Sequence, residues 1–217
     1  MSTLYLKQLP VGPMQNFVYL VGDRESHEAI AVDPAWDIDG ILNVLAADEM
    51  ALTGALITHY HPDHIGGDLM GHHIQGPVEL LERGQKIKIT INKAEADYVP
   101  HVCGLSRSDL SLCESGDEIA VGAQRIRLLH TPGHTPGHQS LLVKLPKTGA
   151  LVLSGDAVHF QANWDNRRVP SNNVDQEQTK ASMERIAGIL VKEKATLWIN
   201  HDKAQRDTLT MAPGFYE

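Results

Sequence analysis

The stretch LITHYHPDHIGGDL, residues 56–69, gathers histidine and aspartate residues in a single bend. An apolar run ends in it, and the polar side chains His59, His61, Asp63 and His64 follow within six positions. Imidazole and carboxylate groups need water or a partner, so folding alone gains nothing by gathering them in one bend. Both groups are ligands for zinc and related first-row metals. The stretch therefore predicts a metal site directly after a buried strand.

Length and composition limit the class of protein. The 217 residues, 42% of them hydrophobic and 21% charged, suit one domain over residues 1–217. A net charge of −8 argues against nucleic acid as a partner, because phosphate contacts need a basic face. The sequence has neither a signal-peptide pattern nor a membrane-spanning run, so we expect a cytoplasmic protein without a membrane partner. Cys103 and Cys113 predict neither a disulfide framework nor a zinc–thiolate site.

Short apolar runs alternate with amphipathic stretches along the chain. We expect strands at residues 16–23, 27–34, 55–58, 86–90, 125–130, 140–145, 150–156 and 196–200. We expect helices at residues 37–48 and 175–194, the second capped by Asp175 and Gln178. Residues 92–99 begin with Asn92 and Glu95 in the arrangement of a capping box. The alternation predicts an α/β fold with helices flanking sheets.

Polar residues follow four of the expected strands, and such loops converge on one rim of a sheet sandwich. Two metals side by side need about seven or eight protein contacts. The chain offers this set: His59, His61, Asp63, His64, His134, Asp156 and His201. Asp156 is the natural bridge, because a carboxylate has two oxygens. Gly66 and Gly67 let the backbone turn tightly into a helix.

A lone histidine is more often a surface or hydrogen-bonded group than a ligand. We give this interpretation to the histidines outside the set: His27, His72, His73, His101, His130 and His138. Asp33 has two interpretations: it fixes a ligand histidine from behind, or it caps the following turn.

The stretches THYHPDHIGG, HTPGHTPGHQS, LSGDAV and NHD, in this order and at these separations, resemble the metallo-β-lactamase superfamily. The resemblance runs from about Phe17 to the end of the sequence. It implies an αββα sandwich with a dinuclear site on one edge. It also implies a first metal on His59, His61 and His134, a second on Asp63, His64 and His201, and Asp156 as the bridge. Two zinc ions are the expected cofactors, and other first-row divalent metals stay open.

Residues 154–186 and 197–205 resemble the N-acyl-homoserine lactonase group. This resemblance implies quorum quenching, in which a metal-bridging hydroxide opens the lactone ring. The first half is similar to glyoxalase II-like hydrolases of glutathione thioesters, which remain the alternative. The sequence ends soon after His201, without the helices on which larger glyoxalase II enzymes bind glutathione. A small lactone or thioester is the expected partner, and the oligomeric state, a homodimer included, stays open.

His159 departs from the lactonase pattern, which has a tyrosine three residues after the bridging aspartate. We interpret Asp63, Asp156 and His159 as catalytic residues. His159 either donates a hydrogen bond to the substrate carbonyl or packs within its loop. Phe160 and Trp164 either line the acyl chain or pin their loop to the sandwich. Arg167 and Arg168 are cations placed near an anionic product, or they are solvated.

Three further classes of protein fit the residues less well. A mononuclear iron persulfide dioxygenase does not need the second metal set of Asp63, His64 and His201. A binding protein with a decayed metal site would not keep every ligand. Zinc β-lactamases of this fold lack the counterpart of Asp156, and a periplasmic one needs a signal peptide.

Overall fold

The computed structural model describes residues 3–217 as two sheets packed face to face. The strands of the first sheet, in pairing order, are β1 Leu4–Val11, β2 Asn16–Asp23, β3 Glu28–Val32, β4 Ala51–Leu56, β7 Lys88–Asn92 and β8 Leu110–Cys113. Those of the second are β13 Thr196–Trp198, β12 Gly149–Leu153, β11 Gln139–Leu145, β10 Gln124–His130 and β9 Glu118–Val121. A small hairpin pairs β5 Gly67–Leu69 with β6 His72–Ile74.

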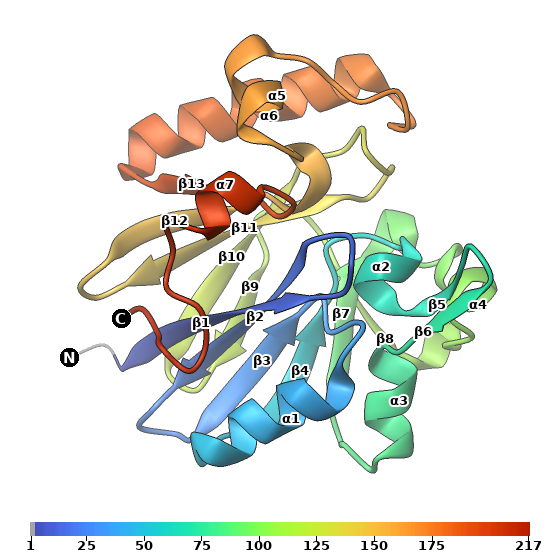
Figure 1. Ribbon diagram of the computed structural model, residues 1–217, viewed down its shortest axis with the longest axis vertical. Helices are drawn as coiled ribbons and strands as arrows, with labels where there is room; N and C mark the ends of the chain where they lie inside the picture. The colour runs from blue at the N-terminus through green and yellow to red at the C-terminus, as the bar shows by residue number, and fades with distance from the viewer. Residues whose placement is uncertain (1–2) are drawn as a thin grey trace.

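Helices cover the outer face of each sheet (Figure 1). The α-helices are α1 Ile38–Ala47, α2 Pro62–Ile65, α3 Pro77–Glu82, α4 Val99–Val102, α5 Gln161–Asn166, α6 Gln176–Glu193 and α7 Lys203–Arg206. Short 3₁₀ turns are η1 Lys93–Glu95, η2 Arg107–Asp109 and η3 Gly155–Ala157. The helices α1 and α3 pack on the first sheet and α6 packs on the second. This layering confirms the predicted αββα sandwich.

Alternating side chains divide the core into layers. Along β2, Tyr19 points between the sheets and packs in the cluster that includes Leu141 of β11. The next residue, Leu20, points the other way, into the cluster that holds Ile41 of α1. A strand covered on both faces reads as a continuous apolar run, which is why β2 and β3 could be predicted from sequence.

Several local predictions are confirmed and others are wrong. Asp175 caps α6 by accepting the N–H of Gln178 at 2.9 Å, as expected. The strand β1 was not predicted, because Lys7 interrupts its apolar pattern. Lys7 is buried and paired with Asp48 at 2.6 Å. Gly66 and Gly67 do not lead into a helix. They end α2 and begin β5, and a Cβ on Gly67 would lie 2.2 Å from the carbonyl oxygen of Val102.

No helix within residues 3–217 has the length and apolar character to cross a bilayer. Met1 and Ser2 lie outside the described residues, and the assignment of residues 1–217 to one domain stays a prediction.

Candidate metal centre

The seven expected ligands lie together at one edge of the sandwich. They come from four places: the loop after β4 with α2, the β10–β11 connection, the turn η3 after β12, and the residues that follow β13. Four groups each have their ligand atoms within 4.8 Å of one another: His59, His61 and His134; His59, His64 and Asp156; Asp63, His64 and His201; and His134, Asp156 and His159. The structure thus brings the predicted residues together, and their role as ligands is a proposal.

The first group is a set of three converging imidazole nitrogens. Nδ1 of His61 lies 3.1 Å from Nε2 of His59 and 2.9 Å from Nε2 of His134. Two nitrogen ligands of one tetrahedral zinc lie about 3.3 Å apart, since each Zn–N bond is roughly 2.0–2.1 Å long. Their spacing is therefore close to what one shared metal requires.

Hydrogen bonds behind the first group fix which nitrogen faces inward. The hydroxyl of Thr58 donates to Oδ2 of Asp33 at 2.7 Å, so it can only accept from Nδ1–H of His59, 3.0 Å away. We therefore assign the lone pair of His59 to Nε2, which points at the group.

The second group places imidazole nitrogens against carboxylates. Nδ1 of His201 lies 2.9 Å from the carbonyl oxygen of Met14 and donates to it, so Nε2 faces inward. Nδ1 of His64 is likewise engaged by Asp33, and Nε2 of His64 lies 3.3 Å from Oδ2 of Asp63. Burial would lower the pKa of His64, but the carboxylates of Asp63 and Asp156 outweigh it and raise that pKa well above its usual value, so this position favours a positive charge. This donor set therefore fits a divalent metal.

Asp156 lies between the two groups, where a bridging carboxylate belongs. Its oxygens are 3.2 Å from Nε2 of His201, 3.4 Å from Nε2 of His64 and 3.5 Å from Nε2 of His134. Its backbone N–H donates to Nε2 of His138 at 2.9 Å. His138, assigned no special role from sequence, is buried and fixes the turn that carries Asp156. Its place behind the ligands depends on tertiary packing.

Burial and charge act in opposite directions in this cluster. Burial lowers the pKa of His134 to about 3, which keeps the ring neutral. Burial would raise the pKa of Asp156, but His201 and His64 outweigh it and hold that pKa well below its usual value. Asp156 is therefore ionised as a bridging ligand must be.

A cavity of about 500 Å³ opens above the cluster. The lining residues are Met14, His61, Pro62, Asp63, Leu69, His134, Asp156, His159, Phe160, Asn172 and His201. His159 sits in this wall with Nε2 3.4 Å from Oδ2 of Asp156 and 12% of its side chain exposed. Phe160 lines the cavity as one interpretation expected, whereas Trp164 does not belong to this lining.

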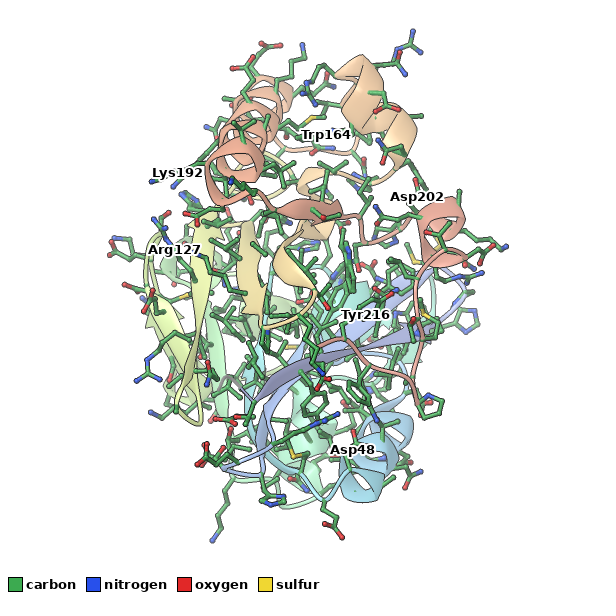
Figure 2. The ribbon with its side chains drawn as sticks, turned by 90° about the vertical axis from the view of Figure 1, so that its left-hand side faces the viewer. Asp48, Arg127, Trp164, Lys192, Asp202 and Tyr216 are labelled. Carbon is green, nitrogen blue, oxygen red and sulfur yellow. The ribbon has the colours of Figure 1, made fainter. Side chains whose placement is uncertain are left out.

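Trp164 instead holds its segment to the sandwich (Figure 2). It packs against the cluster that contains Met183 and Ile186 of α6. The exposed guanidinium of Arg167 lies 4.2 Å above its ring. The second interpretation of Trp164, a pin for the loop, is therefore the one that its contacts support.

A second hollow of about 390 Å³ adjoins the cavity. It is lined by Pro13, Met14, Trp36, Leu69, Met70 and His72, and it shares Met14 and Leu69 with the cavity. The role of Met14 and Leu69 as lining residues was not predicted from sequence, because their local pattern is that of ordinary loop residues. Neither was the role of Asn16, whose Nδ2 donates to Oδ2 of Asp63 at 2.9 Å.

The fold and the cluster can be set beside known proteins. Residues 11–192 match the Metallo-beta-lactamase superfamily. The chain belongs to this superfamily.

Relatives within this superfamily include two kinds of hydrolase. An N-acyl homoserine lactonase of Bacillus sp. is 32% identical over 180 residues, which are 82% of this chain and 68% of the relative. A hydroxyacylglutathione hydrolase of Synechococcus sp. is 31% identical over 123 residues, which are 57% of this chain and 41% of that protein. These relatives confirm the expectation of a hydrolase.

A solved structure supports the same fold over the full chain. The structure of a B. thuringiensis AiiA mutant with N-decanoyl-L-homoserine bound at its active site has a TM-score of 0.75 and 21% identity. The match covers 100% of each chain. At this identity the likeness establishes the architecture, and the resemblance to a metallo-β-lactamase superfamily member predicted from sequence is confirmed.

Proposed function

We propose that this protein opens the lactone ring of N-acyl-homoserine lactones at a centre of two metals, with zinc as the expected metal. The observation that carries the proposal is the cavity itself. Its floor is the seven-residue cluster, and its walls include the apolar side chains Met14, Leu69 and Phe160. A substrate with one polar, hydrolysable end and one apolar tail matches this division.

Two groups of residues would hold the two metals. His59, His61 and His134 hold the first metal; Asp63, His64 and His201 hold the second; Asp156 bridges. Bound metals supply a Lewis acid that polarises the carbonyl and lowers the pKa of water, so that the nucleophile exists near neutral pH.

The surrounding side chains orient the substrate and move the proton. Asp63 presents an oxygen to the cavity and accepts the proton that the attacking water loses, whereas Asp156 keeps the two metal positions together. Water adds to the lactone carbonyl, the ring C–O bond breaks, and the alkoxide leaving group takes the proton. His159 lies in the cavity wall and donates a hydrogen bond to the carbonyl oxygen as negative charge develops on it.

The charge of the cavity favours a lactone over a glutathione thioester. No lysine or arginine belongs to the cavity lining within residues 3–217. Glutathione carries carboxylates, which need cationic partners for recognition. The net charge of −8 repels such a substrate further. An acyl-homoserine lactone has no net charge, and its tail can run past Met14 and Leu69 into the adjoining hollow.

The ring ester is the bond that should break. An ester carbonyl is a better electrophile than the amide that joins the acyl chain. We expect mass spectrometry to find the ring-opened acid with its acyl chain intact. A product without the acyl chain would identify an acylase instead.

The deciding experiment compares three substrates with one enzyme preparation. N-decanoyl-homoserine lactone, S-lactoylglutathione and nitrocefin are supplied to purified protein whose metal content is known. We expect the highest kcat/KM with the lactone and loss of this activity after chelation. A higher kcat/KM with the thioester would replace the proposal with the glyoxalase II-like alternative. One metal in a fully active protein would refute the dinuclear centre.

A further inference from the structure

Glu95 is a buried carboxylate without a place in the proposed reaction. It lies on η1, between β7 and α4, and its exposed fraction is 0%. A buried carboxylate is costly unless hydrogen bonds replace its water. The sequence suggested that Glu95 caps its own helix, but Asn92 alone does so, by accepting the N–H of Ala94 at 3.0 Å. The carboxylate of Glu95 is free to bind elsewhere.

Each oxygen of Glu95 accepts a hydrogen bond from a different ligand loop. Oε2 accepts the N–H of Tyr60 at 2.9 Å, and Tyr60 lies between His59 and His61. Oε1 accepts the N–H of Gly137, three residues after His134. One carboxylate thus joins the loop after β4, in the first sheet, to the loop between β10 and β11, in the second sheet. These two loops supply all three nitrogens of the first metal group.

The shape of the contact shows how closely the loops meet at Glu95. A Cβ on Gly137 would lie 2.7 Å from Cγ and 2.8 Å from Oε1 of Glu95, so only glycine lets this loop close on the carboxylate. Tyr98 comes from the same segment as Glu95. Its ring stacks on that of Tyr60, with centroids 4.5 Å apart and planes 15° apart. The segment therefore holds the first loop at two points.

We propose that Glu95 is the positioning residue of the first metal group, whose carboxylate sets the spacing between His61 and His134. The proposal rests on the metal centre proposed above. Nδ1 of His61 and Nε2 of His134 lie 2.9 Å apart across two loops, and a shared metal needs a lone pair from each of them, although two lone pairs at this distance repel until the metal is bound. A clamp that keeps them together spares the metal the free-energy cost of reassembling the site. Glu95 makes this clamp from one charged group.

Glu95→Gln tests the clamp with almost no change in size. The amide has one oxygen, and its NH₂ group cannot accept an N–H, so one loop is released. We expect the affinity for one of two zinc equivalents to fall roughly 10–100-fold, as for other partners that orient ligands. Competition with a chelator measures this affinity. The absorption bands of the cobalt-substituted protein should shift as well, because the geometry of one site changes.

Glu79→Gln is the matched control. The carboxylate of Glu79 also accepts a backbone N–H, from Gly76 at 2.6 Å, but it lies on α3 outside the cluster. This variant should bind both zinc equivalents with wild-type affinity.

Glu95→Asp keeps the charge and decides the matter if Glu95→Gln does not fold. Its side chain is one methylene shorter and reaches only one of the two loops, so the same selective loss of zinc affinity is expected. Circular dichroism of the metal-free proteins reports the fold. Folded variants with wild-type zinc affinity and an unchanged cobalt spectrum would overturn the proposal, even if their melting temperature fell. These readouts need no substrate, so failure of the lactone assay leaves them intact.

Discussion

Nδ1 of His64 lies 2.9 Å from Oδ2 of Asp33, and both side chains are almost completely buried. The other oxygen of Asp33 accepts the backbone N–H of Thr58 at 2.7 Å. Asp33 therefore ties His64, a candidate ligand, to the end of the strand β4, which precedes the first loop of candidate ligands. Of its two interpretations from sequence, this contact supports the role behind a ligand.

Asp33→Asn should weaken metal binding without disturbing the backbone. Asparagine tolerates the left-handed φ of +50° at this position. It loses the charge that orients His64, so we expect zinc affinity to fall roughly 10–100-fold in a chelator competition. Asp39→Asn, at an exposed aspartate paired with Arg83, is the control and should match wild type. Equal affinities for the two variants would show that Asp33 does not orient the ligand.

Asp156→Ala should abolish most of the activity. Removing the bridge leaves neither the metal spacing nor the nucleophile fixed, so we expect a loss larger than the roughly 100-fold seen for outer partners. Elemental analysis should find fewer than two metals per chain. Asp165→Ala, at an exposed aspartate on the nearby α5, should keep both metals and full activity. Retention of two metals by Asp156→Ala would argue against a bridging carboxylate.

Leu69→Ala and Trp164→Ala should separate substrate contact from loop packing. Leu69 borders both the cavity and the hollow, so its loss should raise KM for long acyl chains more than for short ones. Each methylene that loses its contact costs about 0.8 kcal/mol, or about fourfold in KM. Trp164→Ala should instead lower thermal stability, by less than the roughly 3–5 kcal/mol of a fully buried tryptophan. A changed chain-length preference in Trp164→Ala alone would reverse these assignments.

His159→Phe tests the donor in the cavity wall. Loss of a hydrogen bond to the developing oxyanion should lower kcat on the order of 100-fold, with both metals retained. His159→Tyr restores a donor at the same position and should recover part of the rate. Unchanged kcat in the phenylalanine variant would mean that His159 only packs within its loop.

Asp23 should make stability depend on pH at a site remote from the metals. Burial would raise its pKa, but the Thr3 hydroxyl and the N–H groups of Ala123 and Glu25 outweigh burial and hold the pKa below its usual value. A depressed folded-state pKa stabilises the protein above the unfolded value of about 3.9, and this contribution is lost as pH falls through the folded value. Asp23→Asn should therefore melt below wild type at pH 7, and the gap should shrink below about pH 4. A constant gap in thermal melts between pH 3 and 7 would contradict this.

The layered fold and the set of seven candidate ligands could be predicted from the amino-acid sequence. Both follow from local chemistry: apolar runs such as β2 can be buried only as covered strands. Four imidazole and carboxylate side chains from His59 to His64 form a pattern that predicts metal ligands. The strand β1 could not be predicted from its sequence, because its buried Lys7 looks like a surface residue until its partner Asp48 is known.

The surroundings of the cluster depend on how the two sheets pack together. Asp33, Glu95 and His138 reach the ligands or their loops from other elements, through hydrogen bonds that exist only after the two sheets pack. Leu69 faces the cavity and Trp164 faces α6 for the same reason. The sequence shows that Leu69 and Trp164 are apolar, whereas the direction in which each side chain points depends on residues far away in the chain. The type of each residue shows whether it can bind a metal. The orientation of its side chain and its contact with substrate depend on the packing of the two sheets.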